Sequence, residues 1–201
     1  MPHAPLIVLS GPSGAGKTTV VHRLLERDTL PLRRAVTATS RQKRPGEEDG
    51  RDYHFWTPEA FKAAIDAHEM LEHAVVHGKD YYGTPRSEVD LYRADGKGVI
   101  LVIDVQGAEQ IRRLYPGDHL SVFVAPPAEG ALVELEKRLL ARGDKPESIR
   151  KRLETARAEF ARAGEFDRQL LNADLDTATR DLETLIREQF HPRGLDRCST
   201  T

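Results

Sequence analysis

A glycine-rich segment near the start of the chain is the clearest sign of chemistry in the sequence. It reads GPSGAGKT from Gly11 to Thr18 and fits the pattern G-x-x-x-x-G-K-[ST] at every fixed position. Glycines let a backbone turn its N–H groups around a polyphosphate, and the start of a following helix attracts anions. We expect Lys17 to reach the terminal phosphates and Thr18 to offer its hydroxyl to Mg²⁺. The alternative is a plain glycine turn that caps a helix, but the flanking strand and helix patterns favour the phosphate site.

A second segment, TSRQKRPGEEDGRDYHF from Thr39 to Phe55, mixes many charges with turn-forming residues. Taken alone, such a segment indicates a solvated loop. Beside a nucleotide site it has another interpretation, because Arg41, Arg44 and Tyr53 can hold a second phosphate through forked guanidinium contacts and a phenolic O–H. We therefore expect an acceptor phosphate site here.

The apolar pattern predicts the elements that position these residues. Leu6 to Leu9 is a strand-length apolar run, and it is followed by the glycine loop and by apolar residues at helical spacing. Three more apolar runs, each preceding a helical pattern, are VILVID (99–104), LSVFVA (120–125) and QLLNA near Gln169. The fold class is therefore α/β, a P-loop NTPase-type parallel sheet with four buried strands flanked by helices.

Two regions interrupt this pattern. The stretch from about Thr37 to Asp95 predicts an inserted α+β lobe, with a helix that starts at Thr57 and Pro58 and a turn at HGKD. After Ala128, two long helical patterns meet at GDKP, a hinge candidate. We expect a core at 1–36 and 96–190, the lobe at 37–95, a helical lid at 138–152 within the core, and a flexible tail at 191–201.

Composition limits the classes of function. The 201 residues carry 30 Lys and Arg against 32 Asp and Glu, a net charge of -2, so there is no overall positive field for nucleic acid or an anionic membrane. The single cysteine, Cys198, excludes an internal disulfide and gives no sign of a thiolate metal site. The N-terminus has no basic region and only a short apolar run, so we expect no signal peptide, no membrane span and a cytoplasmic location.

The second segment also carries a family resemblance. It is similar to the acceptor signature S/T-R-x-x-R-x-G-E-x-x-G-x-D-Y-x-F of the guanylate kinases, matched at Ser40, Arg41, Arg44, Gly46, Glu47, Gly50, Asp52, Tyr53 and Phe55. Further matches are LEH around Glu72, YYGT (81–84), IDVQG (103–107), RLLARG (138–143) and LLNADLD (170–176). The sequence thus resembles this family from residue 5 to about residue 190.

The resemblance implies an enzyme that transfers the γ-phosphoryl group of ATP to GMP or dGMP, giving ADP and GDP or dGDP in purine nucleotide recycling, with Mg²⁺ as cofactor. It implies no partner beyond these nucleotides and does not indicate an oligomeric state. On the acceptor side, it assigns the GMP phosphate to Arg41, Arg44, Tyr53 and Tyr82, the guanine to Thr37, Glu72 and Thr84, and a place near Mg²⁺ or the acceptor to Asp104. On the donor side, it assigns ATP to Gly11, Pro12, Ser13, Gly14, Ala15, Gly16, Lys17, Thr18 and Thr19, the neighbourhood of adenine to Asn172, Mg²⁺ to Thr18, and the transferring phosphoryl group to Lys17, Arg138, Arg142 and Arg152.

The chemistry of guanine agrees with the assignment of Glu72. The ring N–H and the exocyclic amine of guanine are adjacent donors, which a carboxylate can accept together, and adenine lacks that pair. Taken alone, Glu72 would be a surface acid on a hairpin, and Asp104, at the end of a strand, an acidic helix cap. The lid arginines have a similar alternative as exposed residues paired with Glu134, Glu136 and Glu154, which we prefer for Arg150 and Lys151.

Two other functions and three departures from the family pattern bear on this interpretation. A guanylate-kinase-like protein-binding module would have a degraded phosphate loop, and a kinase of a ribosyl phosphate would lack the set Arg41, Arg44 and Tyr53. Val102 stands where the family usually has an acid. The segment GKDYYGT is one residue longer than usual, and the lid turn GDKPES, which precedes Arg152, is one residue shorter.

Overall fold

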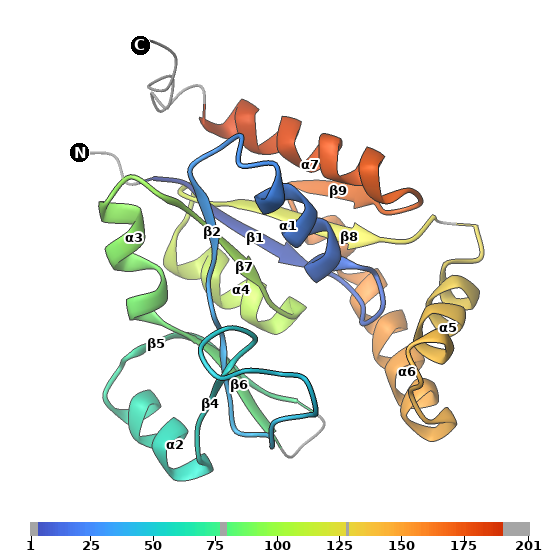
Figure 1. The fold of residues 1–201 in the computed structure, drawn as a ribbon, viewed down its shortest axis with the longest axis horizontal. Helices are drawn as coiled ribbons and strands as arrows, with labels where there is room; N and C mark the ends of the chain where they lie inside the picture. The colour runs from blue at the N-terminus through green and yellow to red at the C-terminus, as the bar shows by residue number, and fades with distance from the viewer. Residues whose placement is uncertain (1–3, 77–79, 128, 191–201) are drawn as a thin grey trace.

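The core is a five-stranded parallel sheet in the order β2-β7-β1-β8-β9 (Figure 1). The computed structural model describes residues 4–76, 80–127 and 129–190. The core elements are β1 (Leu6–Ser10), α1 (Lys17–Glu26), β2 (Leu32–Arg34), β7 (Gly98–Val102), α4 (Val105–Leu114), β8 (Leu120–Ala125), β9 (Arg168–Leu171) and α7 (Leu175–Phe190). None of the helices in the described parts of the chain has the length and apolar run that a bilayer crossing needs.

Strand β1 is buried on both faces, and its side chains divide between two layers of helices. Ile7 and Leu9 pack in one cluster with residues of α1 and α7, whereas Leu6 and Val8 pack in another with residues of α4. The alternation follows from the two-residue period of a strand, and a continuous apolar run is typical of a parallel strand covered on both sides. The carboxyl end of β1 therefore delivers the glycine loop at the edge where ligands of α/β sheets bind.

The four strands expected in the core are confirmed, with two differences. The run VILVID ends as a strand at Val102, and Asp104 caps helix α4 instead of continuing the strand. The fifth strand, β2, was not predicted, because Leu32, Arg33 and Arg34 are only partly buried at the sheet edge and carry no apolar run. A short charged strand of this kind gives no periodic signal.

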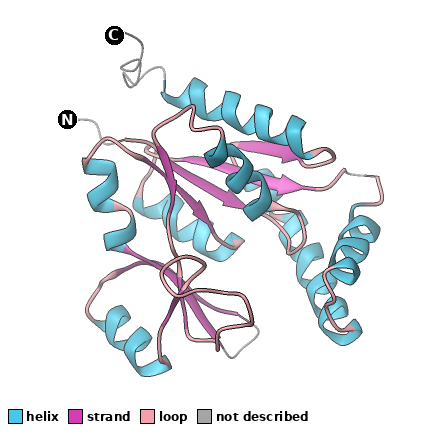
Figure 2. Cartoon of the chain, in the orientation of Figure 1, coloured by secondary structure: helices cyan, strands magenta, loops and turns pink. Residues whose placement is uncertain are grey.

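The inserted lobe has its own four-stranded sheet in the order β4-β3-β6-β5, which lies apart from the core sheet (Figure 2). Its elements are β3 (Ala38–Thr39), β4 (His54–Phe55), α2 (Pro58–Asp66), β5 (Met70–Val76), β6 (Asp80–Pro85), the 3₁₀ turn η1 (Arg86–Glu88) and α3 (Asp90–Ala94). The predicted helix start is confirmed, since the Thr57 side chain accepts a hydrogen bond from Ala60 N at 3.1 Å and Pro58 opens α2. The predicted HGKD turn includes residues 77–79, which lie outside the described residues.

One carboxylate joins the lobe to the core where the chain passes between them. Glu88 accepts hydrogen bonds from Arg33 of β2 at 2.7 Å and from Val36 N at 3.0 Å, and it contacts His54 Nε2 of β4 at 3.1 Å. Next to it, Val89 packs in the core cluster that contains Leu6. The segment around Glu88 and Val89, where the chain returns from the lobe, thus already lies against the core. The boundary that we placed at residue 95 remains a prediction.

A hairpin of two helices, α5 (Ala131–Ala141) and α6 (Pro146–Ala161), extends beside the glycine loop, followed by the 3₁₀ turn η2 (Ala163–Glu165) (Figure 1). The break between the helices falls at the predicted GDKP segment, and Pro146 begins α6. The expected lid, 138–152, covers the end of α5 and the start of α6. The expected tail, 191–201 with Cys198, lies outside the described residues.

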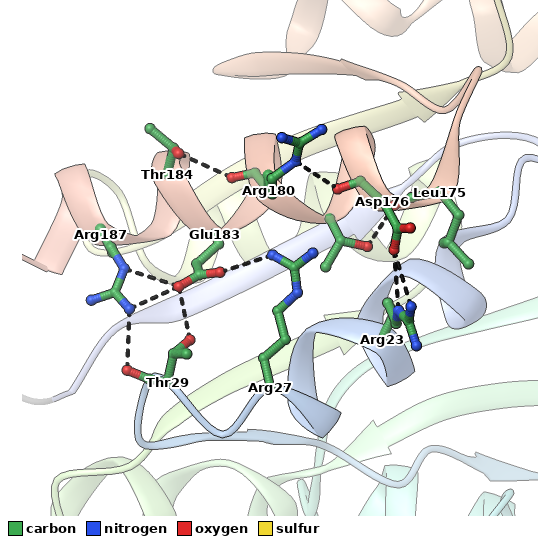
Figure 3. A network of polar contacts seen from close by, with 10 residues as sticks. Arg23, Arg27, Thr29, Leu175, Asp176, Arg180, Glu183, Thr184 and Arg187 are labelled. Carbon is green, nitrogen blue, oxygen red and sulfur yellow. Dashed lines mark hydrogen bonds and ion pairs between the residues drawn. The ribbon is translucent and has the colours of Figure 1, made fainter.

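Helix α1, which follows the glycine loop, is fastened to α7 by a network of polar contacts (Figure 3). Glu183 of α7 accepts hydrogen bonds from Arg27 at 3.2 Å, Thr29 Oγ1 at 2.8 Å and Arg187 at 2.7 Å, and its side chain is only 15% exposed. These hydrogen bonds lower the pKa of Glu183, the one from Arg187 most of all. The network fixes α1 at the end that is remote from the loop.

Replacing Glu183 should therefore destabilise the fold. Glu183→Gln keeps the shape but removes the charge that three donors share, so we expect the free energy of unfolding to fall by about 1–2 kcal/mol. The matched control is Glu26→Gln, because that carboxylate is 66% exposed and pairs with Arg23 at 3.7 Å, and we expect a change within about 0.5 kcal/mol. Urea unfolding of both variants checks this, and equal losses would contradict it.

Candidate active site

At each end of the glycine loop, the surrounding atoms leave no room for a side chain. Gly11 has φ 131°, and a Cβ there would lie 2.1 Å from the carbonyl oxygen of Val124 on β8. Gly16 caps α1 with φ 88°, and a Cβ there would lie 2.3 Å from Nδ2 of Asn172. Positive φ and these close approaches require glycine at both positions. The loop is thus packed between β8 and the chain after β9, with the start of α1 behind it.

Lys17 lies inside this loop. Its Nζ donates hydrogen bonds to Gly11 O and, at 3.1 Å, to Pro12 O. Burial lowers the pKa of Lys17, while the carboxylates of Glu159 and Asp104 act in the opposite direction. The ammonium group therefore lies in a poorly hydrated place where neighbouring carboxylates favour its charged form.

One cavity of about 1030 Å³ collects nearly all of the predicted site residues. Its size is at the upper end of the ~300–1,000 Å³ typical of ligand sites. The expected residues on its wall are Gly11, Ser13, Gly14, Gly16, Lys17, Thr18, Thr19, Thr37, Arg41, Arg44, Tyr53, Glu72, Tyr82, Asp104, Arg138, Arg142, Arg152 and Asn172. Three expected residues are not on the wall: Pro12, Ala15 and Thr84 are buried behind it. The loop, the lobe and the helical hairpin thus contribute to a single space.

On the lobe side, Arg41 is held by protein groups. Its Nη atoms donate to both carboxylate oxygens of Glu47, at 2.7 and 2.5 Å, and its Nε donates to the Tyr82 hydroxyl at 3.1 Å. Hydrogen bonding to Arg41 lowers the pKa of Glu47. The Tyr53 ring lies 6.0 Å from that of Tyr82 and 5.0 Å from the Arg41 guanidinium. The forked face of Arg41 is therefore occupied by Glu47 and is not free for a second forked contact.

Arg44 differs from Arg41. It is exposed, and no hydrogen bond or ion pair holds its guanidinium to another residue in the described ranges. Its backbone N–H donates to Glu47 at 2.8 Å, which places the base of the side chain beside the Arg41–Glu47 pair. The forked phosphate contact expected for both arginines therefore fits Arg44 better than Arg41.

Glu72 lies at the back of the lobe side of the cavity and is only 3% exposed. Its Oε1 accepts a hydrogen bond from the buried Thr84 hydroxyl at 2.7 Å. Burial raises the pKa of Glu72 to about 7, and the negative charge of Asp104 adds to this, whereas the Thr84 hydrogen bond opposes it. A buried carboxyl with few partners is suited to a ligand that brings hydrogen-bond donors. Thr37, which is also buried, lines the same wall.

Asp104 caps a helix, as one interpretation of the sequence expected, and it also lines the cavity. It is the N-cap of α4, with a side chain that accepts from Gly107 N at 2.8 Å, and it also lines the cavity near Lys17 and Glu72. Val102, which stands where the family usually has an acid, lines the cavity as well and packs against the apolar core.

The hairpin brings its arginines to the opposite wall. Arg138 donates to Glu134 at 2.8 Å and to the carbonyl oxygen of Asn172 at 2.9 Å. Arg142 pairs with Asp144 at 2.6 Å. Arg152 donates to the hydroxyl of Ser13 in the glycine loop at 2.5 Å, so the shorter lid turn leaves this residue in contact with the loop. The pairing of Lys151 with Glu147, at 3.8 Å, agrees with its interpretation as a surface residue.

Asn172 connects the loop to the chain after β9. Its Nδ2 donates to Ala15 O at 2.8 Å, and its backbone N–H donates to Ala125 O at 2.7 Å. The Asn172 side chain thus binds the backbone of the glycine loop, and the residue also lines the cavity.

Sequence reasoning missed two carboxylates. Glu47 was part of the matched signature, but nothing in the pattern indicated that it would bind Arg41. Glu159 of α6 is 8% exposed and lines the cavity beside Lys17. Burial raises its pKa, while the charge of Lys17 lowers it. The signal that could have found it is its spacing of seven residues from Arg152, which places both on one face of a helix.

Comparison with known proteins agrees with this geometry. The sequence profile of the guanylate kinase family matches residues 3–189. The chain is similar to the guanylate kinase of Salinibacter ruber, with 46% identity covering 94% of this chain and 98% of the relative, and to that of Aromatoleum aromaticum, with 46% identity covering 90% and 87%. The crystal structure of guanylate kinase from Anaplasma phagocytophilum superposes with a TM-score of 0.76 at 28% identity, covering 94% of this chain and 87% of that one. The chain therefore belongs to the guanylate kinase family.

Proposed function

We propose that the protein transfers the γ-phosphoryl group of ATP to GMP or dGMP, giving ADP and GDP or dGDP. The observation that carries this proposal is that an intact phosphate loop with Lys17 and a buried carboxylate pocket formed by Glu72 and Thr84 open into one cavity. A triphosphate in the loop and a guanine at Glu72 would place their phosphates toward each other. A cytoplasmic location remains the prediction made from the N-terminal sequence.

The reaction needs positioning and charge compensation more than it needs a base. A nucleotide monophosphate is already anionic near neutral pH, so its oxygen can attack without losing a proton to the protein. The barrier comes from bringing two anions together and from charge that spreads over the transferring group. Lys17 in the loop, Arg44 in the lobe and Arg152 beside Ser13 would supply positive charge from three sides.

Base selection is assigned to Glu72. Guanine would donate its ring N–H and its exocyclic amine to the carboxylate, which is oriented by Thr84. AMP would leave the carboxylate buried without donors, and sites of this kind can reject such analogues by about 10⁴-fold. Asn172 would lie near the base of ATP, and Arg138, which donates to the Asn172 carbonyl oxygen, would act on the transferring phosphoryl group.

The residues fit a Mg²⁺ ion that arrives with the nucleotide. The Thr18 hydroxyl is at the start of α1, is exposed and lines the cavity, and Mg²⁺ favours oxygen ligands from one or two protein groups together with substrate phosphates. Thr18 would hold the ion, and the ion would neutralise charge on the β- and γ-phosphates.

Neither alternative function is favoured. A protein-binding module would not need Lys17 and Thr18 in a complete phosphate loop, and a kinase of a ribosyl phosphate would not need the guanine-type pocket of Glu72 and Thr84.

The function is tested with a panel of nucleoside monophosphates. We expect the purified protein, with ATP and Mg²⁺, to produce GDP from GMP and dGDP from dGMP, and to use AMP, CMP and UMP at least about 10³-fold less well in kcat/KM. ADP release measured with a coupled assay checks this, with direct detection of each diphosphate as control. Absence of GDP would refute the proposal.

The acceptor phosphate site is tested at Arg44. Arg44→Met removes a guanidinium that no neighbouring acid holds, so we expect the KM for GMP to rise about 10- to 100-fold, the size of a lost charge-assisted contact, with little change in the KM for ATP. Lys43→Met is the matched control, because this neighbouring cation is exposed and not on the cavity wall. Equal increases in the KM for GMP would show that Arg44 acts only through the overall positive charge of its segment and makes no direct phosphate contact.

The raised pKa of Glu72 predicts a pH dependence of GMP binding. The ionised carboxylate accepts the guanine donors, so GMP binding must remove a proton from Glu72 below its pKa of about 7. The KM for GMP should therefore rise as the pH falls below 7, by up to about tenfold per pH unit.

The control for this pH effect is Glu72→Gln, which should raise the KM for GMP at every pH and remove the step near pH 7. It keeps the ionisation of the GMP phosphate itself, whose second pKa is about 6. KM measured from about pH 5.5 to 8 in both proteins separates the two ionisations. Parallel profiles for wild type and variant would show that Glu72 is not the titrating group.

A further inference from the structure

Helix α4 of the core contacts strand β5 of the lobe, and the side chain of Gln110 makes two hydrogen bonds between them. Gln110 Nε2 donates to the backbone oxygen of His73 at 2.7 Å, and the backbone N–H of His73 donates to Gln110 Oε1 at 3.2 Å. The amide thus pairs with both backbone groups of one residue, as a neighbouring strand would. His73 directly follows Glu72 in the chain.

The contact between Gln110 and His73 lies on an irregular edge strand of the lobe sheet. β5 is the edge strand of the lobe sheet, and its register with β6 shifts between Met70 and Glu72. A bulge interrupts the ladder and redirects side chains, and bulges are common beside active sites. Glu72 therefore lies between the register shift in β5 and His73, the residue that Gln110 binds. Pairing with β6 alone does not fix the position of Glu72.

The same face of α4 also contacts the Glu72 side chain. A Cβ on Gly107 would lie 2.4 Å from Glu72 Oε2, so the carboxylate rests against the helix where no side chain intervenes. Gly107 and Gln110 are three residues apart and hence neighbours on the helix surface. One face of α4 supports the carboxylate at Gly107 and the strand that carries it at Gln110.

We propose that Gln110 is a positioning residue for base selection, because its two hydrogen bonds to His73 hold Glu72 where the carboxylate accepts the ring N–H and the exocyclic amine of guanine together. This inference rests on the proposed function. Gln110 acts through β5 and is not itself on the cavity wall. If β5 moves away from α4, the carboxylate still lies in the pocket but loses the alignment that two simultaneous hydrogen bonds require.

Two roles of Gln110 can be told apart by measurement: alignment of Glu72 for base selection, and a hydrogen-bonded contact that only covers the edge of β5. GMP presents both donors to Glu72, whereas IMP has the ring N–H but no exocyclic amine. A misaligned carboxylate loses the advantage of GMP over IMP, while general loosening of the lobe weakens both substrates equally. The ratio of kcat/KM for GMP to that for IMP therefore reports on alignment.

The test substitutes Gln110→Met, which keeps the length of the side chain and removes both hydrogen bonds. The matched control is Arg113→Met in the same helix, because Arg113 is 76% exposed and its side chain pairs with Glu109. We expect the GMP to IMP ratio to fall about tenfold in Gln110→Met, the size of one to two lost hydrogen bonds, with the KM for ATP unchanged and the Arg113→Met ratio at the wild-type value. Amide hydrogen exchange at His73 should become faster in Gln110→Met only.

Each other outcome has a definite meaning. An unchanged ratio in a Gln110→Met enzyme whose His73 amide exchanges faster would overturn the proposal and leave Gln110 as a strand-edge contact. Equal losses for GMP and IMP would overturn it in the same way. Unchanged exchange at His73 would refute the contact itself. If the wild-type protein makes no GDP from GMP, the proposed function fails, and this inference fails with it.

Discussion

Repulsion between two anions is the constraint on which the rest of the arrangement depends. Two phosphate-bearing substrates can meet only where positive charge surrounds them, yet buried cations without partners are themselves costly. The structure divides the positive charge among the loop, the lobe and the hairpin, and it places two carboxylates near the cation of the loop. Glu159 and Asp104 both favour the charged form of Lys17. The two carboxylates thus oppose the lowering of the Lys17 pKa that burial causes.

The two lobe arginines show two ways of using a cation. Arg41 is fixed by Glu47 and Tyr82 before any ligand binds, so orienting it costs little side-chain entropy on binding. Arg44 has no such restraint among the described residues, so its planar fork can adapt to a phosphate at the cost of being ordered. Glu72 differs from both arginines, because it is an acid. Burial raises its pKa to about 7, so hydrogen-bond donors of a ligand would favour its charged form. In the proposed function, GMP binding would therefore be linked to the ionisation of Glu72, in addition to the ionisation of the GMP phosphate itself.

Features set by local chemistry could be predicted from the sequence, and features set by distant contacts could not. The glycine loop, the Thr57 cap of α2 and the fully buried strand β8 each follow from neighbouring residues, and the structure has all three. Strand β2 could not be predicted, because its three residues pair with β7 across more than sixty positions of chain and carry no apolar period. Glu47, Glu159 and Gln110 are ordinary surface residue types whose roles appear only when separate elements meet. The candidate site was foreseen as a set of residues, but not the pairing of Arg41 with Glu47 or the place of Glu159 beside Lys17.

Helix α4 contacts these separate parts at regular intervals along its length. Asp104 at its N-cap faces the cavity near Lys17, Gly107 one turn later contacts the Glu72 carboxylate, and Gln110 holds β5. Successive residues of a helix rise about 1.5 Å, so these three points are separated by fixed steps of about 4.5 Å along the axis. The helix packs through Val105, Ala108 and Ile111 on the core sheet that also delivers the glycine loop. The Glu72 carboxylate is therefore placed relative to the glycine loop by a core element, even though it is carried by the inserted lobe.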